Sequence, residues 1–547
     1  MNRTLMSRLL KFYYTVKMLR SKQIFYRIYY RFFKVSPFTS TGFSKRDLFS
    51  LSAVPKWNAS RYLANGEFNF MGIQGPVEWD NTNLPKIWLY NLHYLDNLAS
   101  SDEDVSAAGD LVNSWISGNP PFVGIGWEPY PLSLRIVNLI KWFQRQSTLQ
   151  ARWLDSLAAQ THALSEQVEY HILANHLFVN GKALVIAGCF MEGTQAESWQ
   201  ALGLKILDAE VSEQFLADGA HFELSPMYHA SLLWDMCDLV NLALHTPLAP
   251  LRSRLVRWQQ VVKLGILWLR SIQHPDGGIP FFNDAAFGIA PTLNDLEGYA
   301  RLIGCLPDDS DSDRSSVSMR CHIESGYAVM DFGDSCKALL NFAQIAPDYQ
   351  PGHSHADTLS FELSLFGQRI FVNSGTSQYG EDSERKRQRS TAAHNTVEVD
   401  GQNSSEVWAG FRVARRARAM LDTFESSADS ARISCHHDGY VRLKGKNLHA
   451  REWLGKVGEL QVTDRLTGVF GQAVARLFVH PEVRVVQNGE NLIATLPRGE
   501  VVSICIGGAS SINLVDSTWH PEFGKSVSNK CIIAGLSSET LTTTISW

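Results

Sequence analysis

Residues 174–188 read ANHLFVNGKALVIAG, and their apolar side chains recur at the spacing of a buried helix. Two polar side chains, Asn175 and His176, stand together near one end of this stretch. A buried polar group that lacks a partner costs roughly 1–3 kcal/mol. The two residues therefore either bond to nearby backbone groups or face a pocket, and both interpretations remain open at this point.

The helical period of this stretch continues on both sides of it, from about Asp96 to Leu302. Examples are SLRIVNLIKWFQRQS (133–147) and YHASLLWDMCDLVNLALHT (228–246), in which apolar residues recur every three or four positions. Short loops rich in Gly, Pro and Asp separate these segments, as in SGNPPFVGIGWEPYP (117–131). Consecutive helices with short loops predict a domain of antiparallel helical hairpins.

After residue 321 the period changes to two. Stretches such as LSFELSLFGQRIFVNSG (359–375), YVRLKG (440–445) and EVVSICIGG (500–508) are predicted strands, and their number indicates a large antiparallel sandwich. The sequence therefore predicts a multi-domain α+β protein. We expect a basic N-terminal segment and lead-in over residues 1–60, a helical domain over 61–305, a polar linker over 306–320 and a β-sandwich over 321–547.

Composition and charge limit the function classes. Apolar residues make up 45% and charged residues 19% of the 547 positions, which is typical of folded rather than disordered chains. The formal net charge of −5 gives no overall field that would attract nucleic acid, so we expect no nucleic-acid partner. The 8 cysteines are scattered without a CxxC pair, and several lie in apolar runs, as Cys505 does, which predicts buried free thiols.

The first 34 residues carry nine basic side chains and no acidic one. Basic residues interrupt the apolar stretches, so this segment is neither a good signal peptide nor a membrane span. It is either an amphipathic helix on an anionic membrane surface or a basic helix packed on the domain behind it. We accordingly expect a cytoplasmic or inner-membrane-associated protein, with the periplasm as the alternative.

The most pointed polar motif is GHSHAD at residues 352–357. His353 and His355 share one face of an extended segment, and Asp357 continues that face. A His-x-His pair is common at metal sites, although a solvated polar turn is the alternative. Two arginine clusters, at 385–389 and 412–418, surround a further histidine, His394, and would suit an acidic ligand, although charge runs are usually solvated.

Taken together, the motifs resemble the heparinase II/III family of polysaccharide lyases. The segments that carry the resemblance are Asn175–His176, Tyr228, GHSHAD (352–357), NSGT (373–376), RSTAAHNTVEVDG (389–401), WEPYPLSLRIVN (127–138) and HPDGGIPFFNDAA (274–286). The resemblance implies an incomplete (α/α) toroid followed by an antiparallel β-sandwich, with the active site between them. It also implies β-elimination on an acidic, uronate-containing polysaccharide that is heparin-like or a bacterial surface polysaccharide.

The resemblance also implies the roles of individual residues. Asn175 would hold the uronate carboxylate with His176 beside it. Tyr228 would act as acid and is one candidate base, and His353 is the other candidate base, depending on the configuration at C5. Aromatic and basic side chains would contact the sugars; we expect Tyr90, Trp127, Arg135, Tyr379 and Arg389 to do so.

A divalent metal, zinc or calcium, is the one cofactor that the resemblance implies. The matching positions here are His355, Asn373 and His394, and Asn373 supplies a neutral oxygen where the family has a carboxylate. This difference weakens the case for a tightly held ion. Two other functions remain open: a non-catalytic glycan-binding or polysaccharide-assembly protein on the same scaffold, and a metal-dependent hydrolase. The sequence does not predict the oligomeric state.

Overall fold

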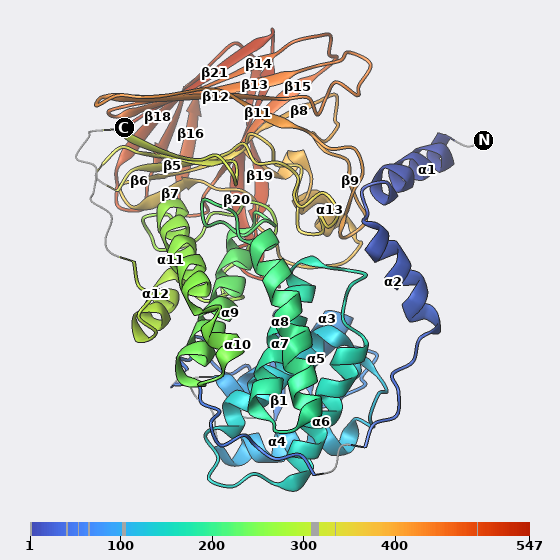
Figure 1. Cartoon of the computed structure of the whole chain (residues 1–547). Helices are drawn as coiled ribbons and strands as arrows, with labels where there is room; N and C mark the ends of the chain where they lie inside the picture. Colours follow the sequence, from blue (N-terminus) through green and yellow to red (C-terminus); the bar gives the residue numbers. More distant parts are fainter. Residues whose placement is uncertain are drawn as a thin grey trace.

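The computed structural model describes residues 3–39, 42–52, 54–63, 66–100, 105–307, 317–333, 335–489 and 491–547. A helical region in the first half of the chain lies against a two-sheet region in the second half (Figure 1). Most of the predicted linker, residues 308–316, lies outside the described residues.

The helices follow the predicted order. Their bounds are α1 Arg3–Val16, α2 Ser21–Phe32, α3 Lys86–Tyr94, α4 Val105–Gly118, α5 Pro129–Phe143, α6 Ala151–Glu166, α7 Ala174–Phe190, α8 Thr194–Gln214, α9 Pro226–His245, α10 Ala249–Arg252, α11 Leu255–Ile272, α12 Leu293–Leu302 and, within the second half, α13 Ser383–Gln388. Between α2 and α3, strands β1 (Glu67–Phe70) and β2 (Ile73–Pro76) form a small antiparallel hairpin.

Helix α7 lies at the centre of the helical region, and nearly all of its residues are buried. Glycines allow it to approach α8 closely. A Cβ atom at Gly188 would lie 2.5 Å from the carbonyl oxygen of Ala196, and one at Gly203 would lie 2.7 Å from that of Gly181. Because α7 is held so tightly, the residues at its N-terminus have a fixed position.

The second half forms two large antiparallel sheets that pack face to face, and a two-stranded antiparallel sheet of β9 and β10. The strands are β3 Ser318–His322, β4 Tyr327–Asp331, β5 Lys337–Asn341, β6 Phe361–Leu365, β7 Gln368–Phe371, β8 Val397–Val399, β9 Val407–Trp408, β10 Arg412–Val413, β11 Ala419–Ser426, β12 Ser430–His437, β13 His449–Lys456, β14 Glu459–Leu466, β15 Ala473–Val479, β16 Arg484–Asn488, β17 Asn491–Thr495, β18 Val501–Gly507, β19 Ala509–Trp519, β20 Val527–Leu536 and β21 Thr540–Ser546. One sheet has the order β11-β12-β13-β14-β21-β18-β17-β16. The other has the order β19-β20-β15-β7-β6-β5-β4-β3, with β8 paired to β15.

Strand β6 joins the two regions. Phe361, Leu363 and Leu365 face the sandwich core, while the alternate residues Glu362 and Ser364 face the helical region. His274 of the helical region contacts both of these polar residues, with Nε2 2.8 Å from Glu362 Oε2 and Nδ1 2.7 Å from Ser364 Oγ. This buried polar contact fixes the helical region against the sandwich.

Two local predictions are wrong. Residues 440–445 form turns rather than a strand, because the hydroxyl group of Tyr440 donates inward to the Val397 carbonyl. Cys505 is exposed, because β18 alternates strictly and places it on the solvent face. No helix among the described residues combines the length and apolar character needed to cross a membrane.

Candidate active site

A cavity of about 1550 Å³ lies where the helical region meets the sandwich. Its lining includes Asn175 and His176 from the start of α7 and Tyr228 from the first turn of α9. His353 and Tyr379 line it from loops of the second half. The structure thus brings all four residues with predicted catalytic roles into one cavity.

Strained backbone lies directly beside this site. Leu173 and Ala174, which precede Asn175, have positive φ angles of 70° and 54°. Leu224 and Asn283 also have positive φ angles, 55° and 58°. Non-glycine residues in this region cost of order 1–3 kcal/mol each, and such strain concentrates at functional sites.

Two of these strained residues stand next to buried acids. Leu224 follows Glu223, and Asn283 precedes Asp284. Glu223 and Asp284 both contact His353, so the strained turns set the positions of the carboxylates around this imidazole.

Glu223 connects Asn175 to His353. Its Oε1 accepts hydrogen bonds from both the backbone nitrogen (3.1 Å) and the side-chain Nδ2 (2.8 Å) of Asn175. Its Oε2 has no hydrogen-bond partner in the described structure and lies 3.6 Å from His353 Nε2. This contact uses one amide hydrogen of Asn175 and leaves the other for a ligand in the cavity.

Asp284 holds His353 from the opposite side. The Nδ1 atom of His353 donates to Asp284 Oδ2 at 2.9 Å, so Nε2 is the nitrogen that can exchange a proton with a ligand. The guanidinium group of Arg385 makes two hydrogen bonds to the same carboxylate. Burial opposes the ionised form of Asp284, but Arg385 outweighs it and holds the pKa of this carboxyl group well below its usual range.

Tyr228 stacks against His353, with ring centroids 3.9 Å apart. Its hydroxyl oxygen lies 2.9 Å from that of Tyr379. Burial, followed by the neighbouring Tyr379, raises the pKa of Tyr228 well above its ordinary value. The raised pKa favours the neutral phenol form of Tyr228.

His176 provides a cationic edge to the cavity. Its Nδ1 lies 3.0 Å from Glu169 Oε1, and its ring packs on Tyr130 with centroids 4.4 Å apart. Burial opposes the charged form, but the Glu169 carboxylate outweighs it and raises the pKa of His176. The imidazolium form can attract an anionic group of a ligand.

The residues at the expected metal position form a hydrogen-bonded chain. His355 Nε2 lies 2.8 Å from Asp284 Oδ1, and His355 Nδ1 lies 3.2 Å from His394 Nε2. The Oδ1 atom of Asn373 accepts the backbone N–H of Asn395. Among the described residues, no group of three His, Cys, Asp or Glu side chains is arranged to hold a metal ion. Two imidazoles and an amide do not supply the four-ligand set that a structural zinc ion takes, so the residues present do not fit a tightly bound ion.

The five expected sugar-binding residues separate into two groups. Tyr90 and Tyr379 line the cavity, and the Tyr90 hydroxyl group bonds to Glu128. Trp127, Arg135 and Arg389 are buried and are not among the cavity-lining residues.

Internal backbone contacts explain why these three residues do not reach the cavity. The Arg135 guanidinium donates to the carbonyl groups of His93 and Gly126, and the Arg389 guanidinium donates to that of Ser354. The Trp127 indole is buried and points to the Asn119 carbonyl. All three side chains therefore brace loops inside the fold.

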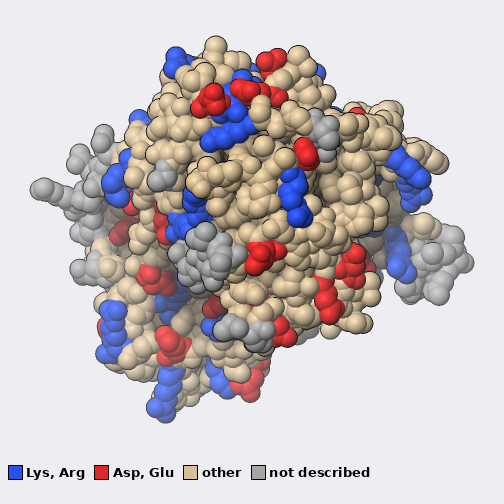
Figure 2. All heavy atoms as spheres, turned by 90° about the horizontal axis from the view of Figure 1, so that it is seen from below, with Lys and Arg blue, Asp and Glu red and all other residues tan. Residues whose placement is uncertain are grey.

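Three of the four arginines of the second cluster form ion pairs within the chain. Arg415 pairs with Glu406, and Arg416 and Arg418 pair with Asp348. Figure 2 shows the same mixture of signs on the face seen from below, where Lys and Arg alternate with Asp and Glu. The fourth arginine, Arg412, is exposed and lies over the Trp408 ring, 5.0 Å from its centroid.

The prediction from sequence missed three acids at the site, Glu169, Glu223 and Asp284. Each lies in an otherwise apolar or aromatic stretch, QVEYHIL (167–173), HFELSP (221–226) or PFFNDAAF (280–287). A carboxylate that is buried in such a stretch needs a partner. A single acid within an apolar stretch was therefore the sequence feature that could have identified these three residues.

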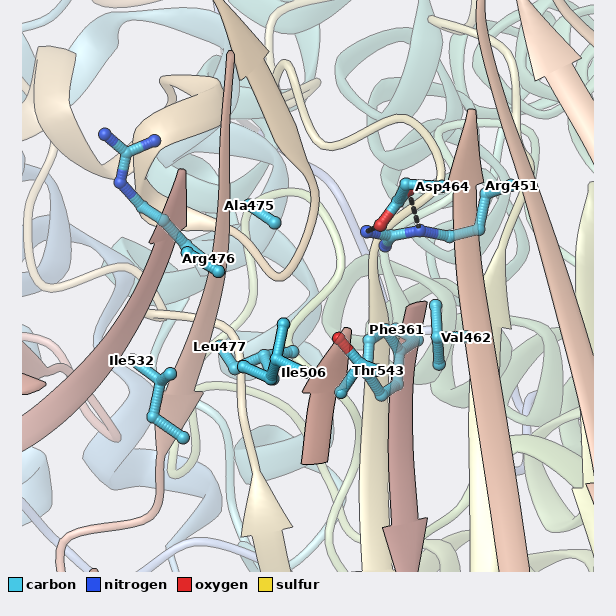
Figure 3. Close-up of a pocket in the computed structure, with 11 residues that line it drawn as sticks. Phe361, Arg451, Val462, Asp464, Ala475, Arg476, Leu477, Ile506, Ile532 and Thr543 are labelled. Atoms are coloured by element: carbon cyan, nitrogen blue, oxygen red, sulfur yellow. Dashed lines mark hydrogen bonds and ion pairs between the residues drawn. The ribbon is translucent and has the colours of Figure 1, made fainter. Parts of the chain in front are cut away.

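A second, much smaller cavity of about 10 Å³ lies inside the sandwich. Arg451 and Asp464 line it and form an ion pair, and the rest of its wall is mainly apolar, with Phe361, Val462 and Leu477 (Figure 3). It has no room for a sugar.

Comparison with known proteins places the chain in a family. The model of the heparinase II/III N-terminus matches residues 108–310, and that of the heparinase II/III-like C-terminal domain matches residues 320–547. A heparin-sulfate lyase of Bacteroides thetaiotaomicron is 24% identical over 383 residues, which cover 61% of this chain and 52% of the relative. One from Pedobacter heparinus is 24% identical over 303 residues, covering 51% and 44%. The chain thus spans about half the length of the curated relatives it matches.

Solved structures agree with the architecture. A crystal structure of heparinase III superposes with a TM-score of 0.70 at 18% identity, covering 96% of this chain and 88% of the other. The heparan sulfate lyase HepC from Pedobacter heparinus superposes with a TM-score of 0.56 at 17% identity, covering 96% and 87%. The expected fold, a helical toroid followed by a β-sandwich, is confirmed. The chain belongs to the heparinase II/III family.

Proposed function

We propose that this chain is a polysaccharide lyase that cleaves a uronate-containing polysaccharide by β-elimination. One observation carries the proposal: a neutral tyrosine hydroxyl group (Tyr228) and a carboxylate-oriented imidazole (His353) lie side by side in a cavity large enough for several sugar units. The names of the relatives, heparin-sulfate lyases, support the same chemistry.

The first requirement of the reaction is that the proton at C5 becomes acidic. As this proton leaves, negative charge spreads into the uronate carboxylate, and donors aimed at that carboxylate stabilise the charge. The free amide hydrogen of Asn175 and the charged edge of His176 are placed to do this. Glu223 fixes the orientation of Asn175, so it is a positioning residue.

The second requirement is a base for C5 and an acid for the leaving oxygen at C4. The raised pKa of Tyr228 favours the neutral phenol, which can donate a proton to the leaving oxygen. His353 donates Nδ1–H to Asp284 and can accept the C5 proton at Nε2. We therefore assign the acid to Tyr228 and the base to His353.

We further propose that the His355–His394 pair acts without a tightly bound metal. The buried guanidinium of Arg385 already neutralises Asp284, and one hydrogen bond joins the two imidazoles, although His394 Nδ1 has no hydrogen-bond partner among the described residues. In this arrangement the pair braces the wall behind His353, and no step of the elimination passes through a metal ion.

The test is an assay on a panel of uronate polysaccharides, sulfated and unsulfated, that follows near-ultraviolet absorbance. An unsaturated uronate end absorbs there, and a hydrolysis product does not. We expect absorbance to rise with at least one substrate and to be lost in Tyr228→Phe. The control variant is Tyr62→Phe, which makes the same change at an exposed tyrosine that does not line the cavity and should keep the parent activity.

The two competing functions give different outcomes in this assay. A glycan-binding protein would bind one of the polysaccharides without producing absorbance, and Tyr228→Phe would leave its affinity nearly unchanged. A metal-dependent hydrolase would shorten the polysaccharide without absorbance, and a chelator would abolish that activity. Either outcome would contradict the proposal.

A further inference from the structure

The two N-terminal helices lie along one side of the molecule, outside both regions of the fold (Figure 1). Helix α2 contacts the body through one face. The Gln23 side chain donates to the carbonyl groups of Ile172 and Tyr349, each at 3.2 Å, and the Tyr30 hydroxyl group donates to that of Val168 at 2.6 Å. Because Val168 and Ile172 belong to the helical region and Tyr349 to the second half, α2 bridges the two.

The opposite face of α2 is apolar and exposed. Residues that follow a helical stripe away from the packed face are Ile24, Phe25, Ile28, Tyr29 and Phe32. Phe32 is 83% exposed. Nothing in the described part of the chain covers this stripe.

Helix α1 repeats the arrangement. Thr15 contacts the body, since the indole nitrogen of Trp408 donates to its hydroxyl group at 3.1 Å. The exposed apolar residues of α1 are Met6, Leu9, Leu10, Phe12 and Tyr13. Together, α1 and α2 carry 10 of the 30 large apolar side chains that are exposed among the described residues, in a small fraction of the chain. Such clustering marks an interaction surface rather than scattered exposure.

Charge identifies the partner. The first 34 residues contain nine Lys or Arg and no Asp or Glu, although the whole chain has a net charge of −5. An apolar stripe flanked only by cations matches an anionic lipid surface, where the apolar side chains enter the acyl boundary and the cations meet the headgroups.

We propose that α1 and α2 bind the surface of an anionic lipid bilayer. The exposed stripes of both helices face the lipid, and the opposite, packed faces keep the helices attached to the rest of the protein. Arg27 of α2 lines the large cavity, so membrane contact would hold the mouth of that cavity beside the lipid surface. This inference is independent of the proposed reaction.

The experiment is co-sedimentation of the full chain with vesicles of phosphatidylcholine, with and without phosphatidylglycerol. We expect binding to the vesicles that contain phosphatidylglycerol and a marked loss of binding at high salt, because exposed charges are screened. Each of Ile28→Glu and Phe32→Glu should weaken binding by about tenfold or more, because a charge replaces an apolar side chain that would enter the acyl boundary.

The matched control is Val256→Glu, which places the same charge on a helix residue that is 79% exposed but lies on α11. It should leave vesicle binding unchanged. All three variants should keep the parent melting temperature, because the replaced side chains are exposed. Equal binding by Phe32→Glu and the parent would overturn the proposal. The proposal would also be overturned if the parent bound neither kind of vesicle but formed a concentration-dependent dimer, and Phe32→Glu were monomeric.

Discussion

The molecule contains two buried clusters built from the same parts, one beside the cavity and one inside the sandwich. In each, an arginine makes two hydrogen bonds to an aspartate, Arg385 to Asp284 and Arg451 to Asp464. In each, that aspartate also accepts from a histidine that contacts a second histidine: His355 and His394 at the cavity, His449 and His437 in the sandwich.

The two clusters differ in the further contacts of their aspartates, since Asp284 also accepts from Thr376 and from one more histidine. Asp284 also holds His353, whose side chain is 13% exposed and lines the cavity, whereas every side chain of the sandwich cluster is buried. The Arg451 guanidinium instead donates its remaining hydrogens to the carbonyl groups of Leu359 and Asn395. We infer that the sandwich cluster has a structural role, and that contact with the accessible imidazole of His353 gives the cavity cluster its part in the proposed reaction.

The largest effect should follow from Asp284→Asn. An amide is a weaker acceptor than a carboxylate for the hydrogen bond from His353 Nδ1–H. The tautomer of His353 that leaves Nε2 unprotonated is then less favoured. We expect kcat to fall by about 10²–10⁴-fold. Arg385 also loses its partner, so stability should fall as well. Steady-state kinetics below the melting temperature separate the two effects, and retention of most of the parent kcat by the folded variant would refute the role.

The next largest effect concerns the buried cluster inside the sandwich. Asp464→Asn should destabilise the fold by about 3–5 kcal/mol, because Arg451 is left buried without its partner. The kcat of the folded fraction should stay within a few-fold of the parent. Denaturant unfolding at neutral pH measures the loss.

The pH dependence of this loss is fixed by the folded-state pKa of Asp464. Burial raises this pKa, but Arg451 and His449 outweigh burial and lower it to about 2. A depressed carboxyl pKa stabilises the fold above the unfolded value of about 3.9, and the contribution disappears as pH falls through about 2. The difference in the free energy of unfolding between the parent and Asp464→Asn should therefore become smaller below about pH 4. A difference that does not change with pH would contradict the depressed pKa of Asp464.

A smaller effect should follow from His176→Gln, which removes the cationic edge. We expect KM to rise about three- to tenfold with kcat little changed, because an ion pair between a partly exposed imidazolium and a substrate carboxylate contributes only a modest binding energy. Glu169 raises the pKa of His176, and Tyr130 and Glu223 are the other titratable groups close to it. The parent KM should increase as pH rises through this raised pKa, and the variant should lack that increase. If KM depended on pH in the same way in the parent and in His176→Gln, the proposed role of His176 would be refuted.

The smallest effect concerns the metal. Dialysis against a strong chelator should leave kcat/KM unchanged, and elemental analysis should find less than one firmly bound zinc per chain. A stoichiometric ion whose removal lowers kcat/KM would show that His355, His394 and Asn373 hold a cofactor after all.

Periodicity and motif spacing predicted the architecture because both depend on local sequence. The stretch 174–188 forms a buried helix, as its apolar spacing predicts, and the polar pair at its start faces the cavity. Burial of charged side chains is a tertiary property, so the sequence did not distinguish Arg389, which binds backbone inside the fold, from Arg385, which grips Asp284. Glu223 acquires its role only where α7 and the loop before α9 meet.

The most direct test of the central claim is the origin of the oxygen atoms in the product. Elimination breaks the bond between C4 and its leaving oxygen without adding water, and hydrolysis adds one water molecule for each bond cleaved. A cleavable uronate polysaccharide should be digested in heavy-oxygen water and its fragments weighed by mass spectrometry. Elimination predicts fragments that end in an unsaturated uronate and are lighter by one water than the hydrolysis products, with no solvent oxygen except that exchanged at the reducing-end hemiacetal, which a digest of authentic fragments in the same water measures. Saturated fragments that are each heavier by one added solvent water would contradict the proposed reaction.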